Sequence, residues 1–411
     1  MPLTSSKNWK TIKLGDIVSI KHGFAFKGEY FSTKETKNIL LTPGNFLIGG
    51  GWKDGKKYYD GPIPDEYVLK AGDLVVTMTD LSKEGDTLGF PALIPDKSDK
   101  IFLHNQRVGL VEVNEDEVSK DFIYYLMRTR DYQKSIVNSA TGSTVKHTSP
   151  TKIGDYEFLL PPLSEQREIA AILGSLDDKI ELLRKENNTL ESIAQTLFKE
   201  WFVDFRFPGA TGKMVDSELG MIPEGWRVGK LGDIGDIVCG KTPSKSNQEF
   251  FGGQVPFIKI PDMHGQMFIV KTEDSLTLSG ADTQRNKYVP ENSICVSCIA
   301  TVGLVSITTE ASQTNQQINS IIPKDEHILQ YLYFVLKSMS SDLQMIGGGG
   351  SATLNVNTGV FSNIEINIPN SDILNLFSNT VSSQFGKIKL NFFEIQTLSK
   401  LRDKILNKIF K

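Results

Sequence analysis

The chain has 411 residues, of which 39% are hydrophobic and 23% are charged, and its formal net charge is −4 at pH 7. This length exceeds what one ordinary core needs, so we expect two or more domains of a soluble protein whose charge alone does not indicate nucleic-acid binding. The sequence has no apolar run of membrane-spanning length and no signal peptide, and its three cysteines suit a reducing compartment, so a cytoplasmic location without membrane contact is expected.

The first part of the chain predicts a mostly β domain. Short apolar segments between Gly, Pro, Asp and Lys turns, such as residues 39–46, 73–78 and 156–161, predict strands. One helix is expected at residues 119–132, where aromatic and aliphatic side chains recur at helical spacing. The domain is therefore expected to be β-rich with minor helix.

Residues 163–201 predict one long helix, with Ser164 as a candidate N-cap. Its apolar residues recur in heptads and predict a coiled-coil seam. The d positions hold Ile169, Leu176, Leu183, Leu190 and Leu197, and the a positions hold Leu173, Ile180, Asn187, Ala194 and Trp201. Asn187 is a polar seam residue of the kind that fixes register. Glu165, Asp177 and Asp178 are expected to be solvated charges. The alternative, an amphipathic helix lying on a globular core, is disfavoured by the narrow apolar stripe.

The second half of the chain repeats the first. Residues 226–243 resemble residues 9–26, including a shared LGDI, and five further blocks follow in the same order. Such a repeat predicts one scaffold used twice for two related targets. A second long helix is expected at residues 373–411, where the first seam recurs after a shift of 208 positions. Three polar residues interrupt this second seam: Gln384, Asn391 and Arg402.

The predicted fold class is therefore α/β in the broad sense (α+β), with two repeated β-rich globular domains separated by two long α-helices that form an antiparallel coiled coil. A helix of the predicted length spans roughly 55–60 Å. The predicted boundaries place globular domains at residues 1–161 and 222–369, spacer helices at 162–207 and 370–411, and a linker at 208–221.

The usual enzymatic constellations are missing from the sequence. No glycine-rich cofactor motif follows a predicted strand, which predicts a non-catalytic chain. Cys295 and Cys298 form a C-x-x-C that could bind zinc or act in redox chemistry. The repeat aligns them with Val75 and Met78, ordinary strand residues, so buried thiols that behave as small hydrophobes are favoured.

Several loops in each domain combine glycine, hydroxyl, amide and basic side chains at matched places in the repeat. Hydroxyls and lysines bind phosphates, whereas Asn, Gln and Arg read base edges. Solvation explains any single loop equally well, and the recurrence in both domains favours DNA. The candidate DNA-binding residues are Lys27, Lys53, Arg107, Ser143, Thr144, Lys146, Thr242, Lys245, Arg285, Gln317, Ser351 and Asn355. The pairs Asn105–Gln106 and Asn315–Gln316 in the same loops could instead be structural amides that cap a turn.

Together these features resemble the specificity subunit of Type I restriction-modification systems. The resemblance rests on LGDI at residues 14–17 and 231–234, GST at 142–144, LPPLSEQREIA at 160–170 and FKEWFVDF at 198–205. It covers essentially the whole chain. The second helix departs from the pattern, because PNSDI at residues 369–373 replaces PPLSEQ.

The resemblance implies two target recognition domains, each reading one half of a split, asymmetric site in double-stranded DNA. It also implies that two methylation subunits dock on the helices and methylate adenine with S-adenosylmethionine, while restriction subunits use ATP and Mg²⁺. Catalysis, cofactors and metals would then belong to the partners. The alternative function is a coiled-coil interaction scaffold that reads no bases.

Overall fold

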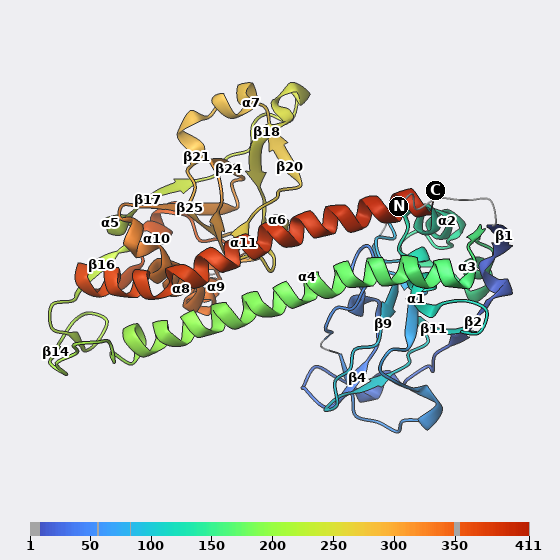
Figure 1. Cartoon of the computed structure of the whole chain (residues 1–411). Coiled ribbons are helices and arrows are strands. Elements are labelled where there is room, and N and C mark those ends of the chain that lie inside the picture. Colours follow the sequence, from blue (N-terminus) through green and yellow to red (C-terminus); the bar gives the residue numbers. More distant parts are fainter. Residues whose placement is uncertain (1–8, 56, 83, 349–353, 411) are drawn as a thin grey trace. The chain divides into compact units, whose positions relative to one another are not determined.

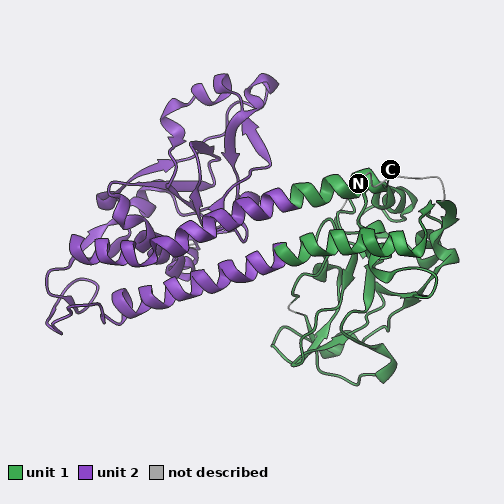
Figure 2. Cartoon of the chain, viewed as in Figure 1, with its two compact units in different colours: residues 1–179, 399–411 green, residues 180–398 purple. Residues whose placement is uncertain are grey.

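The computed structural model describes residues 9–55, 57–82, 84–348 and 354–410. The chain forms two compact units, in which unit 1 comprises residues 1–179 and 399–411 and unit 2 comprises residues 180–398 (Figure 2). Two long helices, α4 (Leu163–Phe198) and α11 (Ser371–Ile409), each contribute to both units (Figure 1). The boundaries of the units therefore cut both helices, whereas the boundaries drawn from the sequence gave each helix a segment of its own.

Unit 1 contains two main β-sheets (Figure 1). The four-stranded sheet is antiparallel and has the order β2 (Val18–His22), β11 (Val108–Val113), β7 (Leu74–Thr77) and β9 (Pro91–Leu93). The five-stranded sheet has the order β3 (Phe31–Ser32), β5 (Tyr58–Tyr59), β4 (Asn38–Leu40), β10 (Ile101–Leu103) and β6 (Val68–Leu69), with β4 and β10 parallel. Two short pairs complete the unit: β1 (Lys10–Lys13) with β13 (Glu157–Leu160), and β8 (Thr79–Asp80) with β12 (Lys146–His147).

Strand β7 explains how these sheets share a core. Successive side chains of a strand point to opposite faces. Leu74 and Val76 pack into one hydrophobic cluster of unit 1, while Val75 between them packs into another. Because both faces of β7 are covered, its sequence is continuously apolar rather than alternating.

The helices of unit 1 correct one prediction. Two helices, α1 (Lys120–Leu126) and α2 (Arg130–Ser139), replace the single helix expected at residues 119–132, and α3 (Pro150–Gly154) follows. Thr129 causes the break, because its hydroxyl donates to the Leu126 carbonyl (2.8 Å) and accepts from the Tyr132 amide (3.4 Å) as the N-cap of α2.

Unit 2 is built in the same way. Its five-stranded sheet has the order β17 (Gly235–Cys239), β25 (Ile318–Pro323), β22 (Ile294–Ser297), β23 (Val305–Thr308) and β19 (Phe268–Ile269). Its four-stranded sheet has the order β20 (Asp274–Leu276), β18 (Phe251–Ile258), β24 (Ser312–Thr314) and β21 (Tyr288–Val289). Two further pairs are β16 (Arg227–Lys230) with β26 (Glu365–Ile368), and β14 (Met214–Val215) with β15 (Ile222–Pro223). Its shorter helices are α5 (Leu231–Ile234), α6 (Ile260–Met263), α7 (Leu278–Asp282), α8 (Leu329–Ser338), α9 (Ser340–Gly347) and α10 (Thr358–Ser362).

The predicted repeat is confirmed in the sheet topology. The order β2-β11-β7-β9 of unit 1 recurs as β17-β25-β22-β23 in unit 2, and β4-β10-β6 recurs as β18-β24-β21. Both copies of LGDI form a short helical turn, a 3-10 turn at Leu14–Asp16 and an α-helical turn at Leu231–Ile234, and in both the aspartate carboxylate caps the start of the turn. Asp16 accepts from the Lys13 amide at 3.1 Å. Asp233 accepts from the Lys230 amide at 2.8 Å.

The start of α4 is held by Gln166. The helix begins at Leu163, so its N-cap position is Pro162, and the predicted N-cap, Ser164, lies inside the helix two positions later. The buried Gln166 side chain accepts from the Ser119 amide (2.9 Å) and donates to the Pro161 carbonyl (2.8 Å). This explains the glutamine in the LPPLSEQ motif, because it ties the helix to the strand end and to α1.

Within unit 2 the two long helices pack antiparallel. Asn187 contacts Asn391, whereas Phe198 further along α4 contacts Phe377 near the start of α11. The predicted a positions of the first long helix are all buried: Leu173, Ile180, Asn187 and Ala194 in α4, and Trp201 in the π-helical turn Lys199–Val203 that follows it. Asn391 does not merely interrupt the second seam, because it is fully buried and donates to the Asn187 side-chain oxygen across 2.8 Å.

Cys295 is a strand residue of β22, as predicted, whereas Cys298 directly follows the end of that strand at Ser297. Cys295 and Cys298 are buried, and burial raises the pKa of the Cys295 thiol to about 12 and that of Cys298 to about 11. Such thiols stay protonated and unreactive. Over the described ranges no group of three or more His, Cys, Asp or Glu side chains is placed to hold a metal ion. No described helix combines the length and apolar character needed to cross a membrane.

Candidate nucleic-acid interface

A glycine joins two of the predicted DNA-binding loops in unit 1. Gly23, just after β2, lies against the turn that starts at Asn105, and a Cβ atom on it would stand only 2.3 Å from the Asn105 carbonyl oxygen. The Phe24 amide donates to the His104 carbonyl (2.8 Å), and the Gln106 amide donates to the Phe24 carbonyl (3.0 Å). The loop leading to Lys27 is therefore fixed beside the turn that carries Arg107.

Unit 2 repeats this junction. A Cβ atom on Gly240 would lie 2.1 Å from the Asn315 carbonyl oxygen, and the Lys241 amide donates to the Thr314 carbonyl (2.9 Å). The Thr242 hydroxyl then donates to the Gln316 side chain at 2.7 Å. The two loops are thus held together by backbone in both units, although their exposed side chains differ.

A third loop is linked to the same turn through one intermediate residue, Met78 in unit 1 and Cys298 in unit 2, which makes one backbone hydrogen bond to the turn and one to the loop. In unit 1 the Met78 amide donates to the Arg107 carbonyl (2.9 Å), and the Thr148 amide donates to the Met78 carbonyl (3.0 Å). In unit 2 the Cys298 amide donates to the Gln317 carbonyl (2.8 Å), and the Val356 amide donates to the Cys298 carbonyl (2.9 Å). Each unit therefore brings three loops, far apart in sequence, to one place, which we call the three-loop junction.

The junction of unit 1 gathers most of its predicted residues. Arg107 is exposed on the turn, and Ser143 and Thr144 are exposed on the third loop. Lys146 is half-buried in β12, where it is paired with Asp80 of β8. Lys27 is exposed at the end of the first loop, with its ammonium 3.8 Å from the Glu29 carboxylate.

Lys53 lies in a different loop of unit 1. Its backbone is fixed by Asn45, whose carbonyl accepts from the Lys53 amide (2.8 Å) and whose side chain donates to the Lys53 carbonyl (3.3 Å). The Lys53 side chain is exposed. These bonds place it in the loop that links β4 to β5, outside the three-loop junction.

The junction of unit 2 unites Thr242, Gln317 and Asn355, and Asn355 bridges Ile299 in an isolated antiparallel pair. Arg285 lies beside this junction, because the side chain of its neighbour Gln284 donates to the Lys241 carbonyl (2.6 Å).

The two other predicted residues of unit 2 are Lys245 and Ser351. Lys245 is exposed, and its carbonyl accepts from Gln248 (3.0 Å). Ser351 lies outside the described residues.

Asn315 fits the turn-capping alternative. Its side-chain oxygen accepts from the Gln317 amide (3.1 Å), and its amide group donates to the Gln317 side-chain oxygen (3.0 Å). Asn315 is buried, whereas Gln317 is half-buried. The Asn315 side chain therefore fixes the position of the Gln317 side-chain oxygen.

Asp80 organises unit 1 near the junction, and the sequence reasoning missed it. The buried carboxylate accepts from the Ser82 amide (2.7 Å) and from the Thr87 amide (2.5 Å) and hydroxyl (2.7 Å). Burial would raise the pKa of Asp80, but these hydrogen bonds outweigh burial and lower it. The charged carboxylate therefore shapes the loop beside β12. An aspartate followed by a polar, glycine-containing loop was the available signal.

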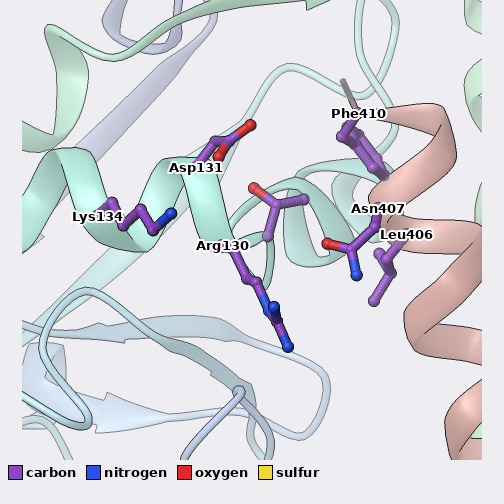
Figure 3. A pocket seen from close by; sticks show the side chains of 7 residues that line it. Arg130, Asp131, Lys134, Leu406, Asn407 and Phe410 are labelled. Atoms are coloured by element: carbon purple, nitrogen blue, oxygen red, sulfur yellow. The ribbon is translucent and has the colours of Figure 1, made fainter.

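A cavity of about 320 Å³ lies elsewhere in unit 1, between the start of α2 and the last turns of α11 (Figure 3). It is lined by Thr129, Arg130, Asp131, Lys134, Leu406, Asn407 and Phe410. None of these residues belongs to the three-loop junction, so this cavity is not part of the candidate DNA-binding surface.

The chain was compared with known proteins. A sequence model described as "Type I restriction modification DNA specificity domain" matches residues 6–192 and 223–391. The HindI specificity subunit of a Type I restriction enzyme from Haemophilus influenzae is 37% identical over 396 residues, covering 80% of this chain and 86% of the relative. The MjaIX specificity subunit from Methanocaldococcus jannaschii is 29% identical, covering 72% of this chain and 69% of the relative.

One solved structure has a similar fold. A Type-I restriction-modification S subunit from M. genitalium is similar with a TM-score of 0.59 at 14% identity, over 100% of this chain and 98% of that chain. The two segments that match the family correspond to the two halves of the repeat, each with its own three-loop junction. This chain therefore belongs to the family of Type I restriction-modification DNA specificity subunits.

Proposed function

We propose that this chain reads a bipartite, asymmetric site in double-stranded DNA, with one half-site for each three-loop junction, and directs adenine methylation and restriction by partner subunits. The matched junctions carry the proposal. Both use the same glycine contact and backbone hydrogen bonds, yet they present different side chains, such as Arg107 in unit 1 and Gln317 in unit 2. Arginine favours guanine and glutamine favours adenine in the major groove, so the two half-sites differ.

Two copies of one partner, a methylation subunit, are proposed to dock on the long helices. Leu182 and Ile193 of α4 are 60% and 52% exposed. The residues 208 positions later, Leu390 and Leu401 of α11, are 67% and 44% exposed. The 11-residue spacing keeps both members of a pair on one face of a helix. Exposed apolar side chains at repeated positions favour two equivalent docking surfaces.

The chemistry is assigned to the partners. The methylation subunits would bind S-adenosylmethionine, and restriction subunits, where present, would use ATP and Mg²⁺ for translocation and cleavage. In this proposal the chain contributes recognition only, and the partners flip the target adenine out of the duplex.

The decisive experiment maps methylated adenine on genomic DNA, using the chain purified with its neighbouring methylation subunit. A bipartite motif with a fixed gap supports two readers. Arg107→Ala should reduce the preference for one base at one position of one half-site by about 1–3 kcal/mol. Gln317→Ala should have the same effect at one position of the other half-site. A continuous motif contradicts two separate readers. An active complex that shows no motif favours the interaction scaffold.

A further inference from the structure

Arg128, just after α1, connects a long helix to a recognition loop within unit 1. Its side chain is only 6% exposed. One terminal nitrogen, Nη1, donates to the Asp177 carboxylate of α4 at 2.5 Å, and Nε donates to the Gly49 carbonyl at 2.9 Å. The guanidinium also stacks on Tyr124 and Tyr125, 5.1 Å and 5.4 Å from their ring centroids. The planar Arg128 guanidinium therefore fixes the Asp177 carboxylate and the Gly49 carbonyl relative to each other.

Asp177 is itself fixed by both long helices, contrary to the expectation of a solvated charge. Its second oxygen accepts from Arg402 of α11 (2.7 Å), and the Tyr125 hydroxyl donates to the first (3.0 Å). Its side chain is 24% exposed. Arg128 is therefore anchored to a point where α1, α4 and α11 of unit 1 meet.

The second acceptor of Arg128, the Gly49 carbonyl, belongs to a glycine loop that packs against the Arg128 side chain. Gly49, Gly50 and Gly51 adopt positive φ values of 87°, 84° and 111°, which favour glycine. A Cβ atom on Gly50 would lie 2.6 Å from the Arg128 Cγ atom. The Gly51 amide then donates to the Pro91 carbonyl (2.8 Å), and Lys53 follows in the same loop. The backbone leading to Lys53 thus depends on the place of Arg128.

The repeat supplies a natural comparison. Lys337, at the end of α8 in unit 2, occupies the position equivalent to Arg128. Its ammonium bonds to Glu191 of α4 and lies 5.7 Å from the Tyr333 ring centroid. In both units this side chain therefore bonds to a carboxylate of α4. In unit 1 it is an arginine, which also donates to the Gly49 carbonyl of the loop that leads to Lys53.

We propose that Arg128 is a positioning residue for DNA recognition, because it bonds Asp177 and the Gly49 carbonyl together and thereby sets the place of Lys53 against DNA. This proposal rests on the proposed function. It goes further by placing the control of one recognition loop at the helix pair, outside the loop itself.

The test compares variants of the chain in complex with its methylation subunit by mapping methylated adenine. Arg128→Lys keeps the charge but loses the two-acceptor fork, and Gly50→Ala displaces the Arg128 side chain without removing it. Lys337→Met is the matched control in unit 2. Arg107→Ala identifies which half-site unit 1 reads. Thermal unfolding and complex assembly of each variant report its fold.

Lysine can also donate to the O6 and N7 atoms of guanine, so a displaced Lys53 should lose base reading as well as phosphate binding. Arg128→Lys and Gly50→Ala should each lower base preference at positions of the unit 1 half-site by at least about tenfold, while the other half-site is unchanged. Lys337→Met should leave the unit 1 half-site unaltered. Equal weakening of both half-sites would overturn the proposal in favour of a general structural role. The proposal would also be overturned if folded Arg128→Lys and Gly50→Ala complexes kept the wild-type base preference at the unit 1 half-site. A wild-type complex without a bipartite motif would refute the proposed function itself, which is a separate and recognisable result.

Discussion

The side-chain amide of Asn391 donates to the side-chain oxygen of Asn187 across 2.8 Å, inside the apolar seam between α4 and α11 in unit 2. Each residue also keeps one buried polar atom without a described hydrogen-bond partner, the Asn187 nitrogen and the Asn391 oxygen. An incompletely satisfied pair is a poor source of stability. Its value lies in register, because any other alignment of the helices would bury a lone amide against leucine.

We expect Asn391→Leu alone to destabilise the protein by about 1–3 kcal/mol, because it leaves the Asn187 amide buried without its partner. The double variant with Asn187→Leu should regain most of that loss, since two leucines fit an apolar seam. Urea unfolding of the wild type, both single variants and the double variant completes the cycle. Additive effects of the two changes would show that the amides do not interact.

Asp177 predicts a dependence of stability on pH. Burial would raise its pKa, but the charges and hydrogen bonds of Arg128 and Arg402 outweigh burial and lower it. A carboxylate with a lowered folded-state pKa stabilises the protein above its unfolded pKa, and this contribution is lost as the pH falls through the folded value.

The free energy of unfolding should therefore fall as the pH drops below about 4, and Asp177→Asn should flatten that part of the curve. Denaturant unfolding between neutral and acid pH measures the effect. Asp178→Asn, a change at the exposed neighbour, is the control and should keep the wild-type profile. Identical profiles for the Asp177 variant and the wild type would argue against the ion pairs.

Gly23 and Gly240 should each control a single half-site. Alanine at either position forces its Cβ within 2.3 Å or 2.1 Å of a carbonyl oxygen, so the first loop must separate from the turn. Gly23→Ala should impair reading by unit 1 only, and Gly240→Ala reading by unit 2 only. Position-resolved methylation measures both. Gly386→Ala in α11 has open space around it and should leave both half-sites intact.

The exposed leucines of the long helices predict a stoichiometry. Leu182→Asp should weaken the docking of one methylation subunit, and Leu390→Asp the docking of the other, because each adds a charge to one of two equivalent apolar surfaces. Native mass spectrometry of each complex should show a shift from two bound partners to one, and the double variant should bind neither. Loss of both partners from either single variant would mean that they do not dock independently.

The repeat, the two long helices and the buried thiols were predictable from the sequence because periodicity and block order survive divergence. The break at Thr129 was not, because a threonine within an apolar helical pattern gives no sign that its hydroxyl will cap a new helix. Asp177 and Asn391 were misjudged for a related reason. Heptad position predicts burial of apolar residues, but it does not show which polar side chain will meet a complementary one across the seam.

The candidate site was predicted in part. Glycine, hydroxyl and amide loops indicated the three segments that meet in each unit, and most of the selected residues lie on them. Arg128 was missed because it resembles any helix-terminal arginine in the sequence. Its importance comes from two acceptors, in Gly49 and Asp177, that only the folded chain brings to it.

Unit 1 is built from two segments that are far apart in the sequence, and this affects when it can fold during synthesis. Leu406 and Ile409 of α11 are buried in the same cluster as Phe122, and the Phe410 ring lies 5.2 Å from the Phe122 ring. The first recognition domain thus lacks part of its core until residues 399–411 have left the ribosome, more than 200 residues after its own sheets. A nascent chain that stops before Leu406 would leave exposed the apolar surface that Leu406 and Ile409 cover in unit 1.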